Sequence, residues 1–163
     1  MFENKTEAQA REEILAIEMA QETMTELSSS IRDSFGLYLN KEASRLVSGI
    51  TGGIYDSMSI DENLNVFLNT KSRLVPLESI SSGAMDQVYL ALRLAAARLL
   101  QGDGEPFPLI FDDSFTLYDD DRLRTALKWL SAAYDGQMII FTCHRREAQM
   151  LRALQAEFQL EEI

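Results

Sequence analysis

Two apolar runs of the chain each end in side chains whose chemistry suits a phosphate group. Residues 109–111 lead into Asp112 and Asp113, and the run at 139–143 leads into His144, the only histidine. If both runs are parallel strands, these side chains lie beyond the carboxyl ends of the strands, where α/β sheets bind ligands. In phosphate-transfer enzymes one acid in that place holds Mg²⁺ while a neighbouring acid orients the attacking water. A histidine there can reach the terminal phosphate, where charge develops during transfer.

Each of these features also has a plainer interpretation. A single acid after a strand most often caps the next helix, and a lone histidine is most often a surface residue or a satisfied core residue. Two adjacent acids, followed six residues later by Asp119, favour chemistry over capping. His144 favours a functional role because it follows the acids by one β-α unit, on the same predicted edge of the sheet.

A third candidate segment lies upstream, where Ser81, Ser82 and Gly83 precede a predicted helix. An ordinary N-cap accounts for the serines. It does not account for three small residues in a row followed by an uninterrupted helix. Bare amides at the positive end of a helix form an anion site, and small side chains let a phosphate approach closely.

The usual phosphate cradle of nucleotide hydrolases is missing from the chain. None of the eight glycines lies in a G-x-x-x-x-G-K-[ST] loop. The sequence therefore predicts one lobe of a nucleotide-dependent protein, with its phosphate loop on another segment or another chain.

The composition is typical of one globular domain with an appended helix. The chain has 163 residues, 46% of them hydrophobic, and a net charge of −11. Such an acidic lobe gains nothing from counterion release, so we expect poor nucleic-acid binding by this segment alone. The single Cys143 excludes an internal disulfide and a cysteine zinc site. The apolar runs are far shorter than the roughly 18 residues of a membrane span, which favours a cytoplasmic protein with no membrane partner.

Hydrophobic periodicity predicts a long helix, a short β meander and then alternating strands and helices. Because alternating β-α units favour parallel strands, we expect an α/β fold with a mainly parallel sheet and flanking helices. We place a helical segment at 1–48 and the lobe at 49–163. The wholly apolar strand at 109–111 is expected to be buried, as in a parallel sheet. The other predicted elements are helices at 6–47, 83–100, 120–133 and 145–157, strands within 54–77 with turns at 61–63 and 69–71, and strands at 138–143 and 158–160.

The long N-terminal helix carries a ragged heptad pattern, interrupted by Gln21 and Ser28. Two interpretations are open for this helix, and near its C-terminal half neither is favoured over the other. One is an amphipathic helix packed on its own domain. The other is the stump of a coiled-coil arm, which is favoured for the first 25 residues because they are polar and have no obvious partner in the chain. The apolar positions of the pattern are Ala10, Ile14, Ile17, Met24, Ile31, Phe35 and Tyr38.

Together these segments resemble the C-terminal ATPase lobe of the ABC-type coiled-coil ATPases. That group includes the SMC proteins, RecN, RecF and the double-strand-break-repair ATPases, and the strongest likeness is to YhaN-like members. Residues 80–83 resemble the signature motif L-S-G-G, and residues 109–113 resemble Walker B. Asp112 matches the magnesium acid and Asp113 the catalytic acid of that motif.

The likeness covers about residues 49–144 and, more loosely, the flanking helices. Asp119 falls where the family has its D-loop aspartate, and His144 matches the switch histidine. Residues 87–94 resemble the signature helix of the YhaN-like branch.

The resemblance implies an ATP-hydrolysing head built from both ends of a long polypeptide. An N-terminal lobe would bring the Walker A phosphate loop, and two identical heads would sandwich two ATP molecules with Mg²⁺. Ser81 and Gly83 would contact the γ-phosphate bound to the opposite head, while Asp112, Asp113 and His144 serve their own. Ser82 and Asp119 would also belong to the nucleotide-binding residues.

The resemblance also implies partners and a cellular setting. We expect this segment alone to be inactive, and we expect a role in DNA repair or chromosome maintenance. DNA would be bound through the full assembly, and a nuclease subunit is a further possible partner.

The chain departs from the family pattern at several places. Ser82 replaces the first signature glycine, Ala84 and Met85 replace a common acidic-basic pair, and Asp113 replaces the usual glutamate. The carboxylate of Asp113 is one methylene shorter, which predicts slow hydrolysis suited to a clamp or switch.

Two other functions are consistent with parts of the sequence. A metal-dependent nuclease or phosphatase could use two metals held by acids at strand ends, but it leaves residues 81–83 unexplained. A dimerisation module built on the N-terminal helix explains nothing beyond residue 50. The acids of the first alternative are Asp112, Asp113, Asp119, Asp120 and Asp121.

Overall fold

The computed structural model describes residues 7–61, 63, 65–102 and 104–162, together with most of their side chains. The expectations for Thr6 and Leu64, and for the side chains of Ile31 and Phe35, lie outside this description. By its internal contacts the chain forms two compact units, Met1–Tyr38 and Leu39–Ile163. The expected division into a helical segment at 1–48 and a lobe at 49–163 stays a prediction.

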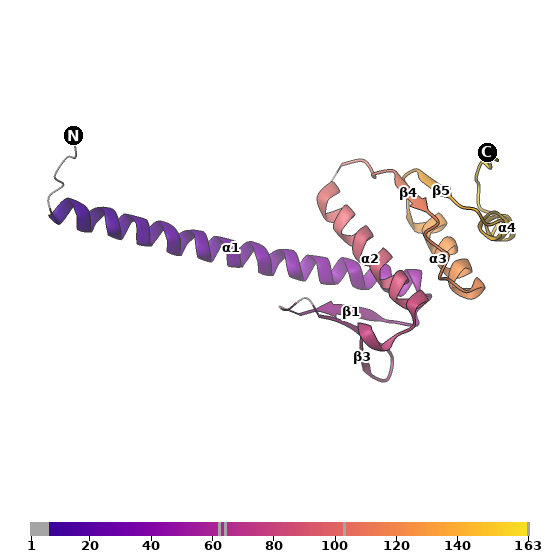
Figure 1. The fold of residues 1–163 in the computed structure, drawn as a ribbon, viewed down its shortest axis with the longest axis horizontal. Helices are drawn as coiled ribbons and strands as arrows, with labels where there is room; N and C mark the ends of the chain where they lie inside the picture. Colours follow the sequence, from indigo (N-terminus) through magenta and orange to yellow (C-terminus); the bar gives the residue numbers. More distant parts are fainter. Residues whose placement is uncertain (1–6, 62, 64, 103, 163) are drawn as a thin grey trace. The chain divides into compact units, whose positions relative to one another are not determined.

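Helix α1 spans Glu7–Ile50, close to the predicted 6–47 (Figure 1). The sequence favours a helix here because it contains no proline and is rich in Ala, Glu, Leu, Gln and Met. In the first unit Ala10 is half-buried, whereas the large apolar side chains that the structure describes are exposed. They include Ile14, Leu15, Ile17, Met19, Met24 and Leu27. This exposure is what a coiled-coil segment without its partner helix would have.

In the second unit the end of α1 is buried. Ala43, Leu46, Val47 and Ile50 recur at helical spacing and are almost fully inaccessible. They belong to one core cluster with apolar side chains of helix α2 (Ser82–Gln101) and helix α3 (Asp120–Ala133). The C-terminal part of α1 is therefore an amphipathic helix packed on its own domain, as one of the two interpretations predicted.

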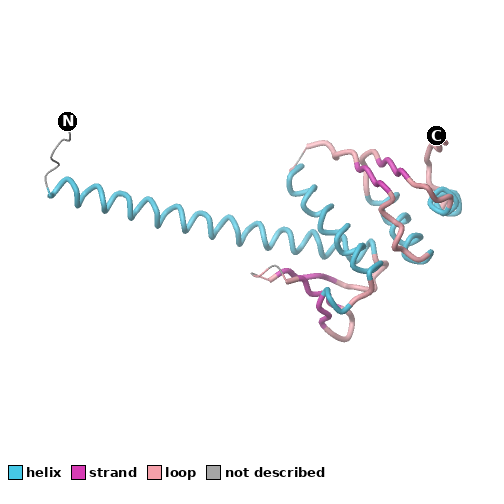
Figure 2. The backbone as a smooth tube through the Cα atoms, in the orientation of Figure 1, coloured by secondary structure: helices cyan, strands magenta, loops and turns pink. Residues whose placement is uncertain are grey.

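Strands β1 (Ser57–Ile60), β2 (Val66–Asn69) and β3 (Leu74–Pro76) form an antiparallel meander (Figure 2). The predicted turn at 61–63 lies between β1 and β2, although Glu62 is outside the described residues, and the predicted turn at 69–71 begins at the last residue of β2. The free edge of β1 is bonded to α1 rather than left open, because Ser44 Oγ donates to the Met58 carbonyl at 2.8 Å and Asn40 Oδ1 accepts from the Ile60 amide at 2.8 Å. The meander is thereby fixed to the lobe through its outer strand.

Strands β4 (Leu109–Asp112) and β5 (Met138–Phe141) pair in parallel and are joined through α3. Helix α4 (Arg146–Ala153) follows β5. The predicted strand at 158–160 is wrong, since those residues form neither helix nor strand. A strand needs a neighbour for its backbone groups, and no pairing to this segment exists among the described residues.

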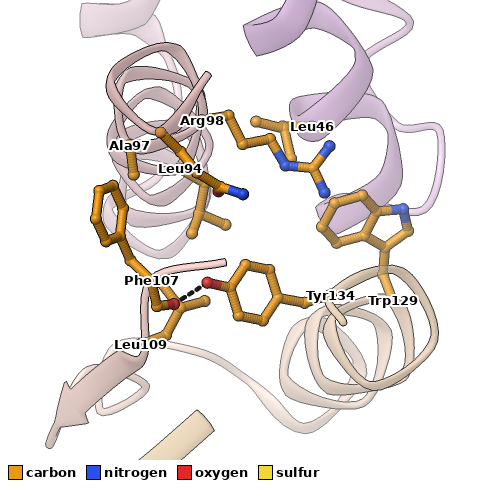
Figure 3. A pocket seen from close by; sticks show the side chains of 9 residues that line it. Leu46, Leu94, Ala97, Arg98, Phe107, Leu109, Trp129 and Tyr134 are labelled. Atoms are coloured by element: carbon orange, nitrogen blue, oxygen red, sulfur yellow. Dashed lines mark hydrogen bonds between the residues drawn. The ribbon is translucent and has the colours of Figure 1, made fainter. Parts of the chain in front are cut away.

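A small cavity of about 10 Å³ lies where α1, α2 and α3 meet (Figure 3). Its lining includes Leu46 from α1, Arg98 from α2 and Trp129 from α3. Arg98 pairs with Glu42 at 2.9 Å and donates to the Ala133 carbonyl at 3.3 Å, so it ties the three helices together. A space of this size admits about one water molecule, which excludes it as a ligand site.

Gly49 gives the first testable prediction, because it lies directly under the indole of Trp129. A Cβ placed there would lie 2.0 Å from Trp129 Nε1, so the ring must move if a methyl group is added. We expect Gly49→Ala to lower the free energy of unfolding by about 1–3 kcal/mol. Urea denaturation measures the change. Gly36→Ala is the control, since nothing lies within 4 Å of that position and alanine favours a helix; equal effects of the two substitutions would contradict the packing argument.

Candidate functional site

The acids after β4 lie at the carboxyl edge of the parallel pair. Asp112 ends the strand and is exposed. Asp113 has a φ of 44°, a left-handed conformation that aspartate tolerates better than most residues. Its amide donates to the Phe141 carbonyl at 2.9 Å, and its Oδ1 accepts from the Cys143 amide at 3.2 Å. Asp113 therefore connects the ends of the two strands.

The histidine segment lies on the same edge, as the sequence predicted. The His144 amide donates to Thr142 Oγ1 at 3.0 Å, and the side chain of His144 is exposed. The bond from Cys143 to Asp113 brings this segment against the acids. The structure thus places 112–113 and 142–144 together, one β-α unit apart in sequence.

Residues 81–83 begin helix α2, with Ser81 as its N-cap. Ser81 Oγ accepts from the Ala84 amide at 3.4 Å, so the capping interpretation is correct as far as it goes. Gly83 is buried, and a Cβ there would lie 2.5 Å from the Leu117 carbonyl oxygen. The small residue is therefore required by contact with the loop that follows the acids, whether or not a phosphate binds.

Asp119 is the N-cap of α3 and accepts from the Arg122 amide at 2.8 Å. This backbone hydrogen bond is the main cause that lowers the pKa of Asp119, and the positive charge of Arg122 adds to it. The Arg122 guanidinium also pairs with the Asp119 carboxylate, and it donates to Ser81 Oγ at 3.3 Å. Arg122 thus joins the loop aspartate to the start of α2.

Sequence reasoning missed two arginines that hold this region together, Arg122 and Arg146. Arg146 donates to the Tyr118 carbonyl at 2.7 Å and to the Phe115 carbonyl at 2.5 Å. The pattern offered one signal for it: a cation in the first turn of α4, where the helix dipole favours acids. For Arg122 the sequence offered only its i,i+3 spacing from Asp119, since its bond to Ser81 joins residues 41 positions apart.

One face of the β4–β5 pair is open. Paired residues of parallel strands share a face, and Leu109, Phe111, Met138 and Ile140 all belong to the core or pack against it. On the opposite face Ile110 is 66% exposed and Phe141 is 49% exposed. The expectation of a strand buried on both faces is therefore wrong for this chain, because nothing among the described residues covers that side.

A groove of about 440 Å³ runs beside the open face, between α2 and β4. Tyr89, Leu90 and Arg93 line it from α2, and Ile110 and Asp113 line it from the strand and its end. Of the two adjacent acids, Asp113 therefore lies in the lining of this groove.

The acid cluster of the nuclease alternative is not assembled among the described residues. No group of three or more His, Cys, Asp or Glu side chains is arranged there to hold a metal ion. The reason is local: Asp119 pairs with Arg122, and Asp120 lies 3.8 Å from Arg146.

Among the helices that the structure describes, none has the length and apolar character of a membrane span.

Solved structures with a similar fold are head domains of SMC proteins. An SMC structure from work on ATP-driven dimerisation and DNA-stimulated activation matches with a TM-score of 0.60 and 15% identity, covering 75% of this chain and 76% of that one. The Smc head domain with an extended coiled coil from Pyrococcus furiosus, bound to the C-terminal domain of ScpA, matches with a TM-score of 0.63 and 18% identity over 88% of this chain and 37% of that one. The head domain from Pyrococcus yayanosii matches with the same TM-score and 17% identity over 88% of this chain and 29% of that one. The chain therefore has the fold of an SMC-like ATPase head lobe.

Curated proteins with a similar sequence are much longer. YhaN of Bacillus subtilis is 31% identical over 99 residues, which are 58% of this chain and 10% of YhaN. Rv1278 of Mycobacterium tuberculosis is 31% identical over 104 residues, 63% of this chain and 12% of that protein. Both relatives are described as uncharacterized. The chain thus spans about a tenth of the length of the curated relatives it matches, and no family model matches it.

The lowered pKa of Asp119 gives a prediction about pH. A carboxylate with a lowered folded-state pKa stabilises the fold above its unfolded pKa, and this stabilisation is lost as pH falls through the lowered value. We expect Asp119→Ala to reduce the urea midpoint at pH 7, with the difference from wild type shrinking below about pH 4. Asp135→Ala, at another exposed acid, is the control and should show little difference at either pH. A deficit that is constant from pH 7 to pH 3 would argue against the charge of Asp119.

Proposed function

We propose that the chain is the C-terminal lobe of an SMC-like head that binds and hydrolyses ATP only together with an N-terminal lobe carrying the phosphate loop. The observation that carries this proposal is the open face of the β4–β5 pair. All-parallel sheets occur with both faces covered, yet Ile110 and Phe141 are exposed on one face of this pair, and Ile110 also lines the groove. A second lobe that covers this face would bring a phosphate loop to the edge where Asp112, Asp113 and His144 lie.

The donors at this edge fit magnesium and a nucleotide. Mg²⁺ is commonly held by one or two carboxylates together with substrate phosphates and water, and Asp112 provides one exposed carboxylate at the strand end. A magnesium ion bound there with ATP would supply neutralising charge for the phosphates. Asp112 then holds the metal, and its place at the strand end follows from its backbone pairing in β4.

Asp113 is suited to orient the attacking water. A carboxylate accepts about four hydrogen bonds, and the bond from the Cys143 amide uses one of them. Because that bond restrains the rotation of the Asp113 carboxylate, its other lone pairs are available to accept from a water molecule in a fixed orientation. His144, at the end of the neighbouring loop, donates to the terminal phosphate as charge develops on it.

The start of α2 serves a second, identical head. Ser81, Ser82 and Gly83 lie at the N-terminus of a 20-residue helix, where amides and the helix dipole favour an anion. Arg122 connects Asp119 to this segment, because its guanidinium pairs with the Asp119 carboxylate and donates to Ser81 Oγ. In this proposal the segment meets the γ-phosphate bound to the opposite head, so two heads associate when ATP is present. The exposed apolar side chains of the first unit belong to a coiled coil, and DNA repair or chromosome maintenance is the setting we propose.

Complementation by an N-terminal lobe tests the proposal. The isolated chain should show no micromolar binding of MgATP by calorimetry, because the phosphate loop supplies most contacts to the β- and γ-phosphates. Adding a separately produced phosphate-loop lobe should restore ATP hydrolysis. Ile110→Asp should weaken that association at least about tenfold, since one buried, unpaired charge costs more than 1.4 kcal/mol. Leu74→Asp, at an exposed position of β3 away from the groove, is the matched control. Micromolar MgATP binding by the chain alone would refute the proposal.

Asp113→Asn tests the assignment of the catalytic acid. Asparagine keeps an oxygen for the Cys143 amide and tolerates the left-handed backbone, so the fold should be preserved. We expect kcat of the complemented head to fall by about 10²–10⁴-fold with little change in KM, because the charge that orients water is lost. Asp112→Asn should instead raise the magnesium concentration needed for activity. Wild-type turnover by both variants would show that these acids are not the Walker B pair.

A further inference from the structure

The backbone between Asp113 and Asp119 connects the acids to the start of α2, and it is held from two sides. Its buried rings, Phe115 and Tyr118, anchor it to the core, with ring centroids 5.5 Å apart. Its Leu117 carbonyl lies against Gly83, leaving no space for a Cβ. The position of this loop therefore determines where the start of α2 lies relative to the strand ends.

Arg146, the first residue of α4, bonds the same loop. One guanidinium bonds two carbonyls, those of Phe115 at 2.5 Å and Tyr118 at 2.7 Å. The planar fork of arginine can bridge two acceptors from two nitrogens in a fixed geometry, whereas the three donors of an ammonium group all leave a single nitrogen on a flexible stem. Arg146 thus fixes the distance between two points of the loop as well as its distance from α4.

Arg146 is connected to the segment of His144 through Glu147 and Thr142. Its Nε lies 3.4 Å from Glu147, whose side chain is only 4% exposed. Glu147 in turn accepts from Thr142 Oγ1 at 3.3 Å, and Thr142 Oγ1 accepts from the His144 amide at 3.0 Å. The other charged group facing Arg146 is Asp120, at 3.8 Å. A continuous set of bonds therefore runs from the His144 backbone to the loop.

We propose that Arg146 is a positioning residue that couples the two halves of the nucleotide machinery in one head. It joins the segment of His144 to the loop 113–119, and Arg122 then joins that loop to Ser81. Through this connection the edge that serves the head's own nucleotide sets the placement of the segment that serves the opposite one. This inference rests on the proposed function.

The first test measures turnover in the complemented head, formed by the full chain and a phosphate-loop lobe. Arg146→Gln should lower kcat at least tenfold and leave KM for ATP within about threefold, because Asp112 and the phosphate loop still bind the nucleotide. Arg146→Lys keeps the charge beside Glu147 but lacks the two spaced donor nitrogens that meet the two carbonyls, so it should recover only part of the rate. Arg145→Gln is the control: Arg145 is the exposed neighbour, and its variant should retain wild-type turnover.

The second test uses the full chain alone and does not depend on ATP hydrolysis. Hydrogen exchange of the amides at 82–85 and 114–121 should be faster in Arg146→Gln and Arg146→Lys, while the β1–β3 meander keeps its protection. If the wild-type head hydrolyses no ATP, the proposed function fails while this result still tests the connection. Full wild-type turnover in Arg146→Lys, a rise in KM as large as the loss in kcat, or unchanged exchange at 82–85 would each overturn the inference. If Arg146→Gln loses protection throughout, the lysine variant decides the outcome.

Discussion

The close contact between the Leu117 carbonyl and Gly83 is the constraint on which the candidate site depends. It brings a loop that begins at the strand-end acids against the first turn of a helix from a different part of the chain. No side chain fits between the two backbones, so a larger residue at position 83 would force the loop and the helix apart. The buried rings of Phe115 and Tyr118 hold the loop on the core, and burial raises the pKa of the Tyr118 hydroxyl, which keeps that side chain neutral. The bonds that Arg122 and Arg146 make lie on the two elements that meet at this contact or on their neighbours.

Two arginines stabilise the loop in a lobe that is otherwise strongly acidic. Arg122 pairs with Asp119 and reaches Ser81, and Arg146 bonds carbonyls on the other side of the same loop. Both are about 28% exposed, so their charges are partly desolvated and their hydrogen bonds are stronger than those of a surface pair. Each arginine also joins two elements, so long-range contacts add to the local hydrogen bonds of the loop, such as the one from the Tyr118 amide to the Phe115 carbonyl at 3.0 Å.

The open face of the parallel pair indicates what is absent from the lobe. The antiparallel meander has its outer edge bonded by Asn40 and Ser44, and its inner residues are buried. The parallel pair has no comparable protection, since Ile110 and Phe141 remain exposed beside a groove of about 440 Å³. The two sheets thus differ in how well they are covered, and the contacts within the lobe give no reason for the exposed face of the parallel pair. The proposed association with a second lobe would account for this difference, because the burial of those side chains would stabilise the complete head.

The sequence alone determined the elements and the order of the motifs, because these depend on local signals. Helical periodicity located α1, α2 and α3, the turn residues located the meander, and Asp119 and Ser81 cap their helices as short-range hydrogen bonding requires. The strand predicted at 158–160 failed because a strand is defined by a partner, which no local pattern supplies. Only the tertiary structure decided why Gly83 is small, how Asp113 bonds Cys143, and that Arg122 and Arg146 hold the loop. Those contacts join residues about 30 or more positions apart, and their geometry is set by how the helices and strands pack rather than by the residues on either side.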